Sequence, residues 1–349
     1  MSRKPLAAGS VTLEDVARVA GVSRATVSRV INGSSTVDPA MRELVEAAVA
    51  ATGYVPNRAA RSLVTRRTDS IALVVSEAEQ RQVADPFLGR IFTDPFFGRV
   101  VSGVLEVTRP RGVQLVLMLV DDAPSRANLI GYLQQGHVDG VVLICGHVAD
   151  PLPALLAEAR LPAVLSGRPG RPTPISFVEA DQRTGATLAV DHLVSVGRRR
   201  IATVSGPLDM PSSQERLTGF REALAGHGLA EAGMVEGDYT QAGGAEAMRQ
   251  LLARTPDFDA VFVSSDLMAL GALPVLARAG RRIPQDVSLV GFDDSSAALA
   301  CDPPLTTIRQ PLEEMAARMA QLLLQQIVEP GAALQSAVFH PTLVVRESA

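Results

Sequence analysis

The chain has 349 residues, more than one ordinary domain holds, and 47% of them are hydrophobic, which is enough for sizeable cores. Its net charge of −4 hides an asymmetry: residues 1–67 hold ten basic and five acidic side chains, a net of +5, and the rest carries −9. We find no apolar run of about 18 residues and no secretory leader, so we expect a soluble, cytoplasmic protein. The two cysteines, Cys145 and Cys301, make neither a disulfide framework nor a metal cluster.

Two short helices are predicted near the N-terminus. Residues 13–20 have apolar side chains at helical spacing, and Thr12 is placed to cap this helix with Asp15 as its capping-box partner. Gly21 can end the helix in the left-handed conformation, and Ser23 can cap the next one. Two helices joined by such a short turn have the spacing of a helix-turn-helix.

A third helix completes the predicted head. Asp38 is its expected cap, Pro39 lies at the first helical position, and Gly53 marks the end. Three helices of this size can share a small core and leave the second helix free to enter a major groove. The expected apolar stripes are Val27, Val30 and Ile31 in the second helix and Leu44, Val45, Ala48 and Val49 in the third.

The other side of the second helix carries the residues for DNA recognition. Arg24 and Arg29 can bond guanine edges or phosphates, and Ala25 leaves room for a thymine methyl group. The alternative is an ordinary solvated face. The head residues predicted to contact double-stranded DNA are Thr12, Ser23, Arg24, Ala25, Thr26, Ser28, Arg29 and Asn32.

The link after the head is YVPNRAARSLVTRRTDS (54–70), where Asn57 can cap a single helical turn over 58–63. A turn this short is marginal by itself. The run VTLEDVARVAGVSRATVSRVING followed by YVPNRAARSL closely resembles the lactose-repressor (LacI/GalR) family of bacterial transcription regulators.

That resemblance implies a role for the link. Leu63 would be the apolar wedge that two subunits insert into the minor groove, Ala60 would approach the neighbouring bases, and Asn57 and Arg58 would contact DNA from a hinge helix that orders only on DNA. A homodimer would then read an inverted-repeat operator with half-sites about a helical turn apart. The alternative for this segment is a plain linker.

From Ile71 onward, buried strands alternate with helices, which is typical of parallel sheets covered on both faces. Strands are expected at 71–75, 113–119, 139–145, 201–206, 259–265 and 286–292, and helices at 96–107, 125–135, 183–197, 216–228, 242–253 and 267–280. The predicted fold class is an α/β body of two Rossmann-like subdomains, similar to type I periplasmic binding proteins as the resemblance implies, after a small all-α helix-turn-helix domain.

The expected domains are a head at 10–53, a hinge at 54–67 and a body at 68–349. Within the body, the first subdomain is expected at about 68–178 plus 306–333 and the second at about 179–305 plus 334–349. The final segment, SAVFHPTLVVRESA, is expected to form a last strand. It has no leucine heptads that would form a tetramer, so a dimer is favoured.

Candidate ligand-binding residues lie beyond predicted strand ends. The resemblance implies that Arg216 in SSQERLTGF and Asp293 in VGFDDSS are the family's cleft arginine and aspartate, and that Tyr239 in GDYTQAG is an aromatic platform. Charged groups hold sugar hydroxyls, and an aromatic face covers the apolar side of a sugar ring. The predicted effector-binding residues are Phe96, Phe97, Arg216, Tyr239, Ser265, Asp266, Asp293 and Gln310.

Several of these residues also have structural interpretations. Arg216 could pair with an acid on its own helix, and Asp266 could be mainly the N-cap of the following helix. One of Phe96 and Phe97 is expected in the core and the other in the cleft, and Asp294 is expected to serve structure. Of two near-copies, DPFFGR (94–99) is placed at the cleft mouth, and the role of DPFLGR (85–90) stays open.

The identity of the ligand is approached through resemblance alone. The run GFDDSSAALACDPPLTTIRQP, with LSGRP and GPLDM, resembles actinobacterial repressors that answer to cellobiose, cello-oligosaccharides or other β-glucosides. The alternatives in the same fold are a purine, a phosphosugar or a phosphoprotein co-repressor.

Other classes of protein fit less well. The five histidines are scattered and no nucleophile motif, phosphate loop or metal-ligand spacing occurs, so we expect no catalysis, no cofactor and no metal. A transport-type binding protein would not need the DNA-reading head, and the body argues against a recombinase, though not against an activator. The sequence therefore predicts a ligand-responsive transcriptional repressor without a membrane partner.

Overall fold

The computed structural model describes residues 11–31, 36–55, 67–77 and 87–349. The chain divides into two compact units, Met1–Thr68 and Asp69–Ala349. Within the described residues, no helix is long and apolar enough to cross a membrane. The hinge helix and five predicted DNA contacts lie outside the described residues; these contacts are Asn32, Asn57, Arg58, Ala60 and Leu63.

The first unit contains three helices, α1 (Leu13–Ala20), α2 (Arg24–Ile31) and α3 (Pro39–Thr52). The capping box at α1 is present: the Asp15 amide donates to the Thr12 hydroxyl at 3.3 Å, and the Thr12 amide donates to the Asp15 carboxylate at 3.0 Å. Gly21 ends α1 with a φ of 66°. These local signals, together with the Asp38 cap of α3, set where each helix begins and ends.

One apolar residue from each helix forms the centre of the head: Val16, Val27 and Val45 are all fully buried. The prediction that Leu44 belongs to the buried stripe is wrong, because its side chain is 49% exposed. The buried face of α3 contains Val45 and Ala48, and Leu44 lies about 100° of helical rotation away from Val45. The small core therefore closes without Leu44.

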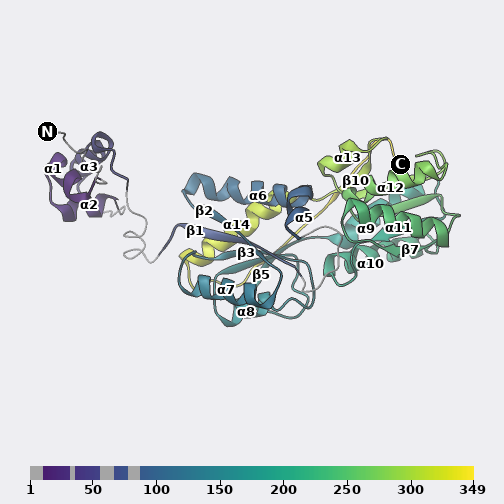
Figure 1. Cartoon of the computed structure of the whole chain (residues 1–349), viewed down its shortest axis with the longest axis horizontal. Helices are drawn as coiled ribbons and strands as arrows, with labels where there is room; N and C mark the ends of the chain where they lie inside the picture. The colour runs from purple at the N-terminus through teal and green to yellow at the C-terminus, as the bar shows by residue number, and fades with distance from the viewer. Residues whose placement is uncertain (1–10, 32–35, 56–66, 78–86) are drawn as a thin grey trace, which may run out of the picture. The chain divides into compact units, whose positions relative to one another are not determined.

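The body has two lobes, and each lobe is a six-stranded sheet with helices packed on both faces (Figure 1). The first sheet has the order β11-β5-β4-β3-β1-β2. Helices α6 and α14 share a core with one face of it, and α7 and α8 share a core with the other face. Its elements are β1 (Ser70–Ser76), α5 (Phe87–Thr93), α6 (Pro95–Thr108), β2 (Gln114–Val120), α7 (Ala123–Gln134), β3 (Val141–Cys145), α8 (Leu152–Glu158), β4 (Ala163–Ser166), β5 (Ser176–Ala180), α14 (Leu312–Val328) and β11 (Ser336–Phe339).

The second sheet has the order β12-β10-β9-β8-β6-β7. Helices α11 and α12 share a core with one face, and α9 and α10 share a core with the other. All pairings are parallel except that of β10 with β12. Its elements are α9 (Gln182–Ser195), β6 (Ile201–Ser205), α10 (Pro211–Gly226), β7 (Met234–Glu236), α11 (Gln241–Arg254), β8 (Ala260–Val263), α12 (Asp266–Arg278), β9 (Ser288–Asp293), α13 (Ser296–Ala300), β10 (Thr306–Arg309) and β12 (Thr342–Val344).

Three crossings join the lobes, after β5, after β10 and between β11 and β12. Two expected subdomain boundaries are wrong in detail. Strand β10 was assigned to the first subdomain from 306 onward, but it pairs with β9 in the second sheet. Strand β11 was assigned to the second, but it pairs with β5 in the first sheet. The expected single last strand is therefore two strands in different sheets, because the chain crosses at residues 340–341.

Close packing between α9 and α10 gives a first test of this fold. A Cβ added at Gly219 on α10 would lie 2.5 Å from the Arg183 carbonyl oxygen on α9. We expect Gly219→Ala to lower the free energy of unfolding by about 1–3 kcal/mol, because the backbone must shift to accept the methyl group. A urea titration measures this loss.

Gly226, the last residue of α10, is the matched control. An added Cβ there meets no atom within 4 Å, so Gly226→Ala should be neutral or slightly stabilising. Equal losses from both variants would contradict the close approach of the two helices.

Candidate functional sites

The exposed side of α2 is the candidate DNA-reading surface. Ser23, Arg24, Ala25 and Arg29 are exposed, whereas Val27 and Val30 are buried. The Ser23 hydroxyl accepts from the Thr26 amide at 3.1 Å and so caps the helix. Arg24 pairs with Glu14 of α1 at 2.7 Å. One helix thus presents two guanidinium groups and a small residue on the side opposite its core.

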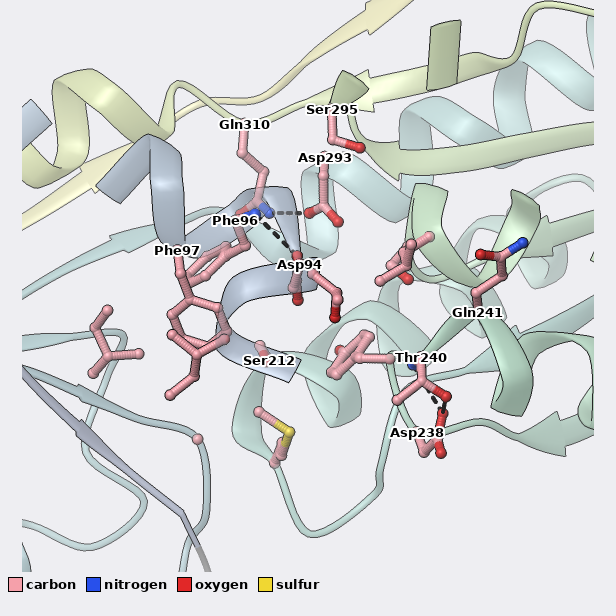
Figure 2. Close-up of a pocket in the computed structure, with 18 of the residues that line it drawn as sticks. Asp94, Phe96, Phe97, Ser212, Asp238, Thr240, Gln241, Asp293, Ser295 and Gln310 are labelled. Atoms are coloured by element: carbon pink, nitrogen blue, oxygen red, sulfur yellow. Dashed lines mark hydrogen bonds between the residues drawn. The ribbon is translucent and has the colours of Figure 1, made fainter. Parts of the chain in front are cut away.

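The body contains a cavity of about 710 Å³ between the lobes. Its walls come largely from segments that follow parallel strands: Glu77 after β1, His147 after β3, Gln182 after β5 and Ser265 after β8. Parallel strands bring their carboxyl ends to one edge, which is where ligands bind in such sheets. Figure 2 shows Phe96 and Phe97 of the first lobe across this space from Asp238, Thr240 and Gln241 of the second.

The polar centre of the cavity is formed by Arg216, Asp293 and Gln310. The Gln310 amide donates to the Asp293 carboxylate at 2.6 Å, as Figure 2 shows, and an Arg216 nitrogen lies 3.9 Å from the same carboxylate oxygen. Arg216 also donates to Gln182 Oε1 at 2.7 Å and to the Ser264 carbonyl, and it stacks on Phe292 with its guanidinium carbon 3.7 Å from the ring centre. The expected alternative, pairing with an acid on its own helix, does not occur.

Asp293 and Tyr239 have left-handed backbones, with φ of 111° and 64°. Such conformations are uncommon for residues other than glycine and cluster at functional sites. Burial raises the pKa of Asp293, while Arg216, Gln310 and Arg99 act in the opposite direction. A carboxylate with a buried cation beside it can accept hydrogen bonds from hydroxyl groups of a ligand.

Arg99 ties this centre to both lobes. It lies on α6 of the first lobe and donates to the Asp293 carbonyl at 2.8 Å and to the Gln310 carbonyl at 3.1 Å. It also pairs with Glu313 at 2.7 and 2.8 Å through two nitrogens. Arg99 belongs to the DPFFGR segment, so this segment links the backbone at Asp293 to the first lobe.

Three aromatic side chains line the cavity. Phe96 and Phe97 are both half-buried and pack edge to face with their centres 5.3 Å apart, so neither is confined to the core. Tyr239 donates or accepts a hydrogen bond with Ser213 at 2.7 Å. A Cβ at Gly206 would lie 2.2 Å from the Tyr239 ring, so glycine makes room for the platform. These rings give a ligand apolar faces from both lobes.

The prediction that Asp266 binds the effector is wrong, because Asp266 does not line the cavity. It is fully buried behind the cavity wall, where it accepts from the Ser295 amide at 2.7 Å and the Thr307 hydroxyl at 2.6 Å. It is also not the cap of α12, because Ser265 caps that helix. Burial, and next the Asp293 carboxylate, raises the pKa of Asp266. Asp266 braces β10 and the segment after β9 rather than lining the cavity.

The other seven predicted effector-binding residues all line this one cavity: Phe96, Phe97, Arg216, Tyr239, Ser265, Asp293 and Gln310. Sequence reasoning missed further polar lining residues, among them Glu77, Asp94, Arg99, His147, Gln182, Asp238 and Gln241. Glu77 and His147 follow the expected strands at 71–75 and 139–145 by two residues, so the rule that selected Ser265 could have found them. Gln182 follows β5, a strand outside the expected set. Asp294 lies beside the site and pairs with Arg309 and Arg346, a structural role as expected.

The near-copy DPFLGR overlaps α5. Ile91 and Thr93 of this helix line the cavity, and Ile91 is buried. In the part of the chain that the structure describes, no group of three histidine, cysteine, aspartate or glutamate side chains is arranged to hold a metal ion.

Two family models match the chain, one in each of its two compact units. Residues 12–57 match the family model of bacterial regulatory proteins, lacI family, and residues 190–349 match a periplasmic binding protein-like domain. The chain is 49% identical over 341 residues to the HTH-type transcriptional regulator CelR of Thermobifida fusca, covering 97% of this chain and 98% of that one. It is 34% identical over 342 residues to the ribose operon repressor of Escherichia coli K12, covering 97% and 99%.

Two solved structures of transcriptional regulators match the chain over nearly its whole length. A transcriptional regulator CelR–cellobiose complex matches with a TM-score of 0.75 and 45% identity over 97% of this chain and 100% of that chain. The lac repressor dimer bound to operator and the anti-inducer ONPF matches with a TM-score of 0.81 and 29% identity over 97% and 99%.

Proposed function

Because the chain belongs to the LacI family of bacterial regulatory proteins, we propose that it is a homodimeric repressor that cellobiose or a related β-glucoside releases from an inverted-repeat operator. The carrying observation is the cavity between the lobes, where Arg216, Asp293 and Gln310 converge between aromatic faces. A full-length relative at 49% identity is a CelR, and a structure at 45% identity is a CelR–cellobiose complex.

The chemistry of the cavity suits a sugar. Its volume of about 710 Å³ lies within the range of small-molecule sites, about 300–1,000 Å³. Arg216 and Gln310 offer N–H donors and Asp293 offers acceptors to hydroxyl groups, while Phe96, Phe97 and Tyr239 offer faces to the C–H side of sugar rings. Phe96 and Phe97 come from the first lobe and Arg216, Asp293 and Tyr239 from the second, so a sugar in the cavity would contact both lobes.

The proposed mechanism is a population shift. The head, about 10–53, reads a half-site through α2, and the hinge, 54–67, places Leu63 in the minor groove. Sugar closes the lobes, shifts the contacts between the first lobes of the dimer and separates the hinges. Operator affinity then falls, because the sugar binds the DNA-incompetent state more tightly than the competent one.

The same geometry supports binding without catalysis. The cavity hydroxyls of Ser265 and Ser295 accept amide hydrogen bonds and cap the starts of α12 and α13. The relatives compared are transcriptional regulators, and a protein that reads an operator works in the cytoplasm beside the chromosome.

The direct test is fluorescence anisotropy of an operator duplex from upstream of the gene. At fixed salt, we expect tight specific binding that cellobiose weakens at least about tenfold, the effect of about 1.4 kcal/mol of coupling. A panel of ribose, a purine and a phosphosugar serves as the control. Release of the operator by one of those compounds would show that cellobiose is not the effector. If the protein binds every inverted repeat no more tightly than random DNA, the proposal that it is a repressor is refuted.

A further inference from the structure

A second polar cluster joins the lobes at the rim of the cavity. The His147 ring, from the segment after β3, lies 2.7 Å through Nδ1 from the Asp209 carboxylate of the second lobe. Its Nε2 contacts the Glu77 carboxylate after β1. The Val148 amide also donates to the Asp209 carbonyl at 3.0 Å. Because His147 and Asp209 belong to different lobes, separating the lobes here breaks this bond.

Both neighbours of the ring are carboxylates, and ionised carboxylates only accept hydrogen bonds. A neutral imidazole has one N–H and can donate to only one of them, whereas the imidazolium ion has two. The His147 side chain is only 3% exposed, so water offers little compensation for a lost partner. The complete bridge from Glu77 through His147 to Asp209 therefore requires the imidazolium form, with a proton on each ring nitrogen.

Among the described residues, two further groups near the ring, Arg126 and Cys145, do not reverse this conclusion. In the first lobe, Arg126 donates to the Glu77 carbonyl at 2.8 Å, but its charge is offset by Asp150 at 3.7 Å. The Cys145 thiol, whose pKa burial raises well above its ordinary value, donates to the His147 carbonyl at 3.7 Å. Burial alone lowers the pKa of His147, but the hydrogen bonds and charges of Glu77 and Asp209 outweigh burial and hold this pKa above its ordinary value.

We propose that His147 is a proton-dependent latch of the effector cleft: the closed lobes bind the ring proton more tightly than the separated lobes do, and the proton acts as a second ligand that favours closure. The proposal rests on the proposed function for the identity of the first ligand. Below the ordinary histidine pKa of about 6.5 the ring is charged in both states, and closure keeps its full advantage. As pH rises through the higher pKa of the closed state, the proton leaves and the advantage is lost.

The latch can be tested without any sugar. Histidine ring NMR gives the pKa of His147, whose signal is assigned as the one missing in His147→Gln. We expect this pKa to fall in Asp209→Asn, because the variant keeps the shape and removes the charge across the cleft. Asp191→Asn is the matched control: Asp191 contacts a different histidine, His227, at 2.6 Å within the second lobe, so this variant should leave the pKa of His147 unchanged. An unchanged His147 pKa in Asp209→Asn would overturn the latch.

The coupling to ligand is tested by calorimetric titration with cellobiose across pH. We expect affinity to be several-fold higher at about pH 6 than at about pH 8, since each unit of pKa rise on closure contributes at most tenfold. The dependence should flatten in His147→Gln and Asp209→Asn and persist in Asp191→Asn. The same pH slope in all four proteins would refute the coupling. If no sugar binds at any pH, the proposed effector fails, while the ring titration still decides whether His147 holds a proton between the lobes.

Discussion

Replacing Asp293 by asparagine is expected to abolish the sugar response while leaving operator binding intact. The carboxylate accepts from Gln310 at 2.6 Å and lies beside Arg216, so it offers the ligand two oriented acceptor oxygens with a cation at hand. Loss of one member of a buried charged hydrogen-bonding set costs about 2–5 kcal/mol, a loss of roughly 30-fold or more in sugar affinity. Calorimetry with cellobiose measures the affinity, and anisotropy measures the operator.

Asp257→Asn is the charge-matched control for this variant, because Asp257 is exposed in the same lobe and does not line the cavity. It should keep both the sugar affinity and the response. An Asp293→Asn protein that still releases operator at the same sugar concentration would place the ligand elsewhere.

Replacing Arg29 by alanine is expected to weaken operator binding by about 1–3 kcal/mol, roughly 5- to 150-fold in Kd, and to relax the preference at one base pair of each half-site. Arg29 is exposed on α2, one helical turn after Ala25, on the side opposite buried Val27 and Val30. Its guanidinium can therefore reach a base edge or a phosphate when α2 lies in the major groove. Anisotropy with the operator and single-base variants measures both effects.

The control removes the same charge from the body instead of the head. Arg171 is exposed in the loop between β4 and β5, and Arg171→Ala should change operator affinity little at fixed salt. Equal losses from the two variants would mean that net charge alone, rather than the face of α2, governs binding.

Local signals in the sequence were enough to predict the head and much of the body. The capping box at Thr12, the left-handed Gly21 and the Asp38 cap all act within four residues, and all are present in the structure. Buried parallel strands such as β1, β3 and β8 are short apolar runs, which is the pattern that predicted them. These features depend on neighbours along the chain.

Features set by distant partners were harder to predict. Helix α14 was not among the expected helices, although seven of its residues are buried against the first lobe. Strands β10 and β11 are short, and only pairing with β9 and β5 shows which sheet each one joins. Leu44 was misplaced because apolar character alone does not determine the direction in which a helix residue points.

The candidate ligand site also contains some residues that the sequence could predict and others whose roles depend on distant partners. Arg216, Asp293 and Gln310 could be selected because each lies near a strand end or matches a family motif, and they line one cavity. Asp266 was selected by the same rule, yet its side chain turns away to Thr307 and Ser295. The roles of Arg99 and His147 depend on contacts with residues more than 60 positions away, which spacing in the sequence does not reveal.

The split of the first lobe along the chain has a consequence for how the protein is made. Arg99 and Glu313, paired in the finished lobe, are 214 residues apart. A ribosome adding about 5–20 residues per second needs roughly 10–40 s to make the chain between them. During that interval the first sheet lacks α14, whose Met315, Met319 and Leu323 cover one of its apolar faces. The head can fold on emergence, but the yield of sensing domain depends on keeping that face from aggregating until translation nears its end.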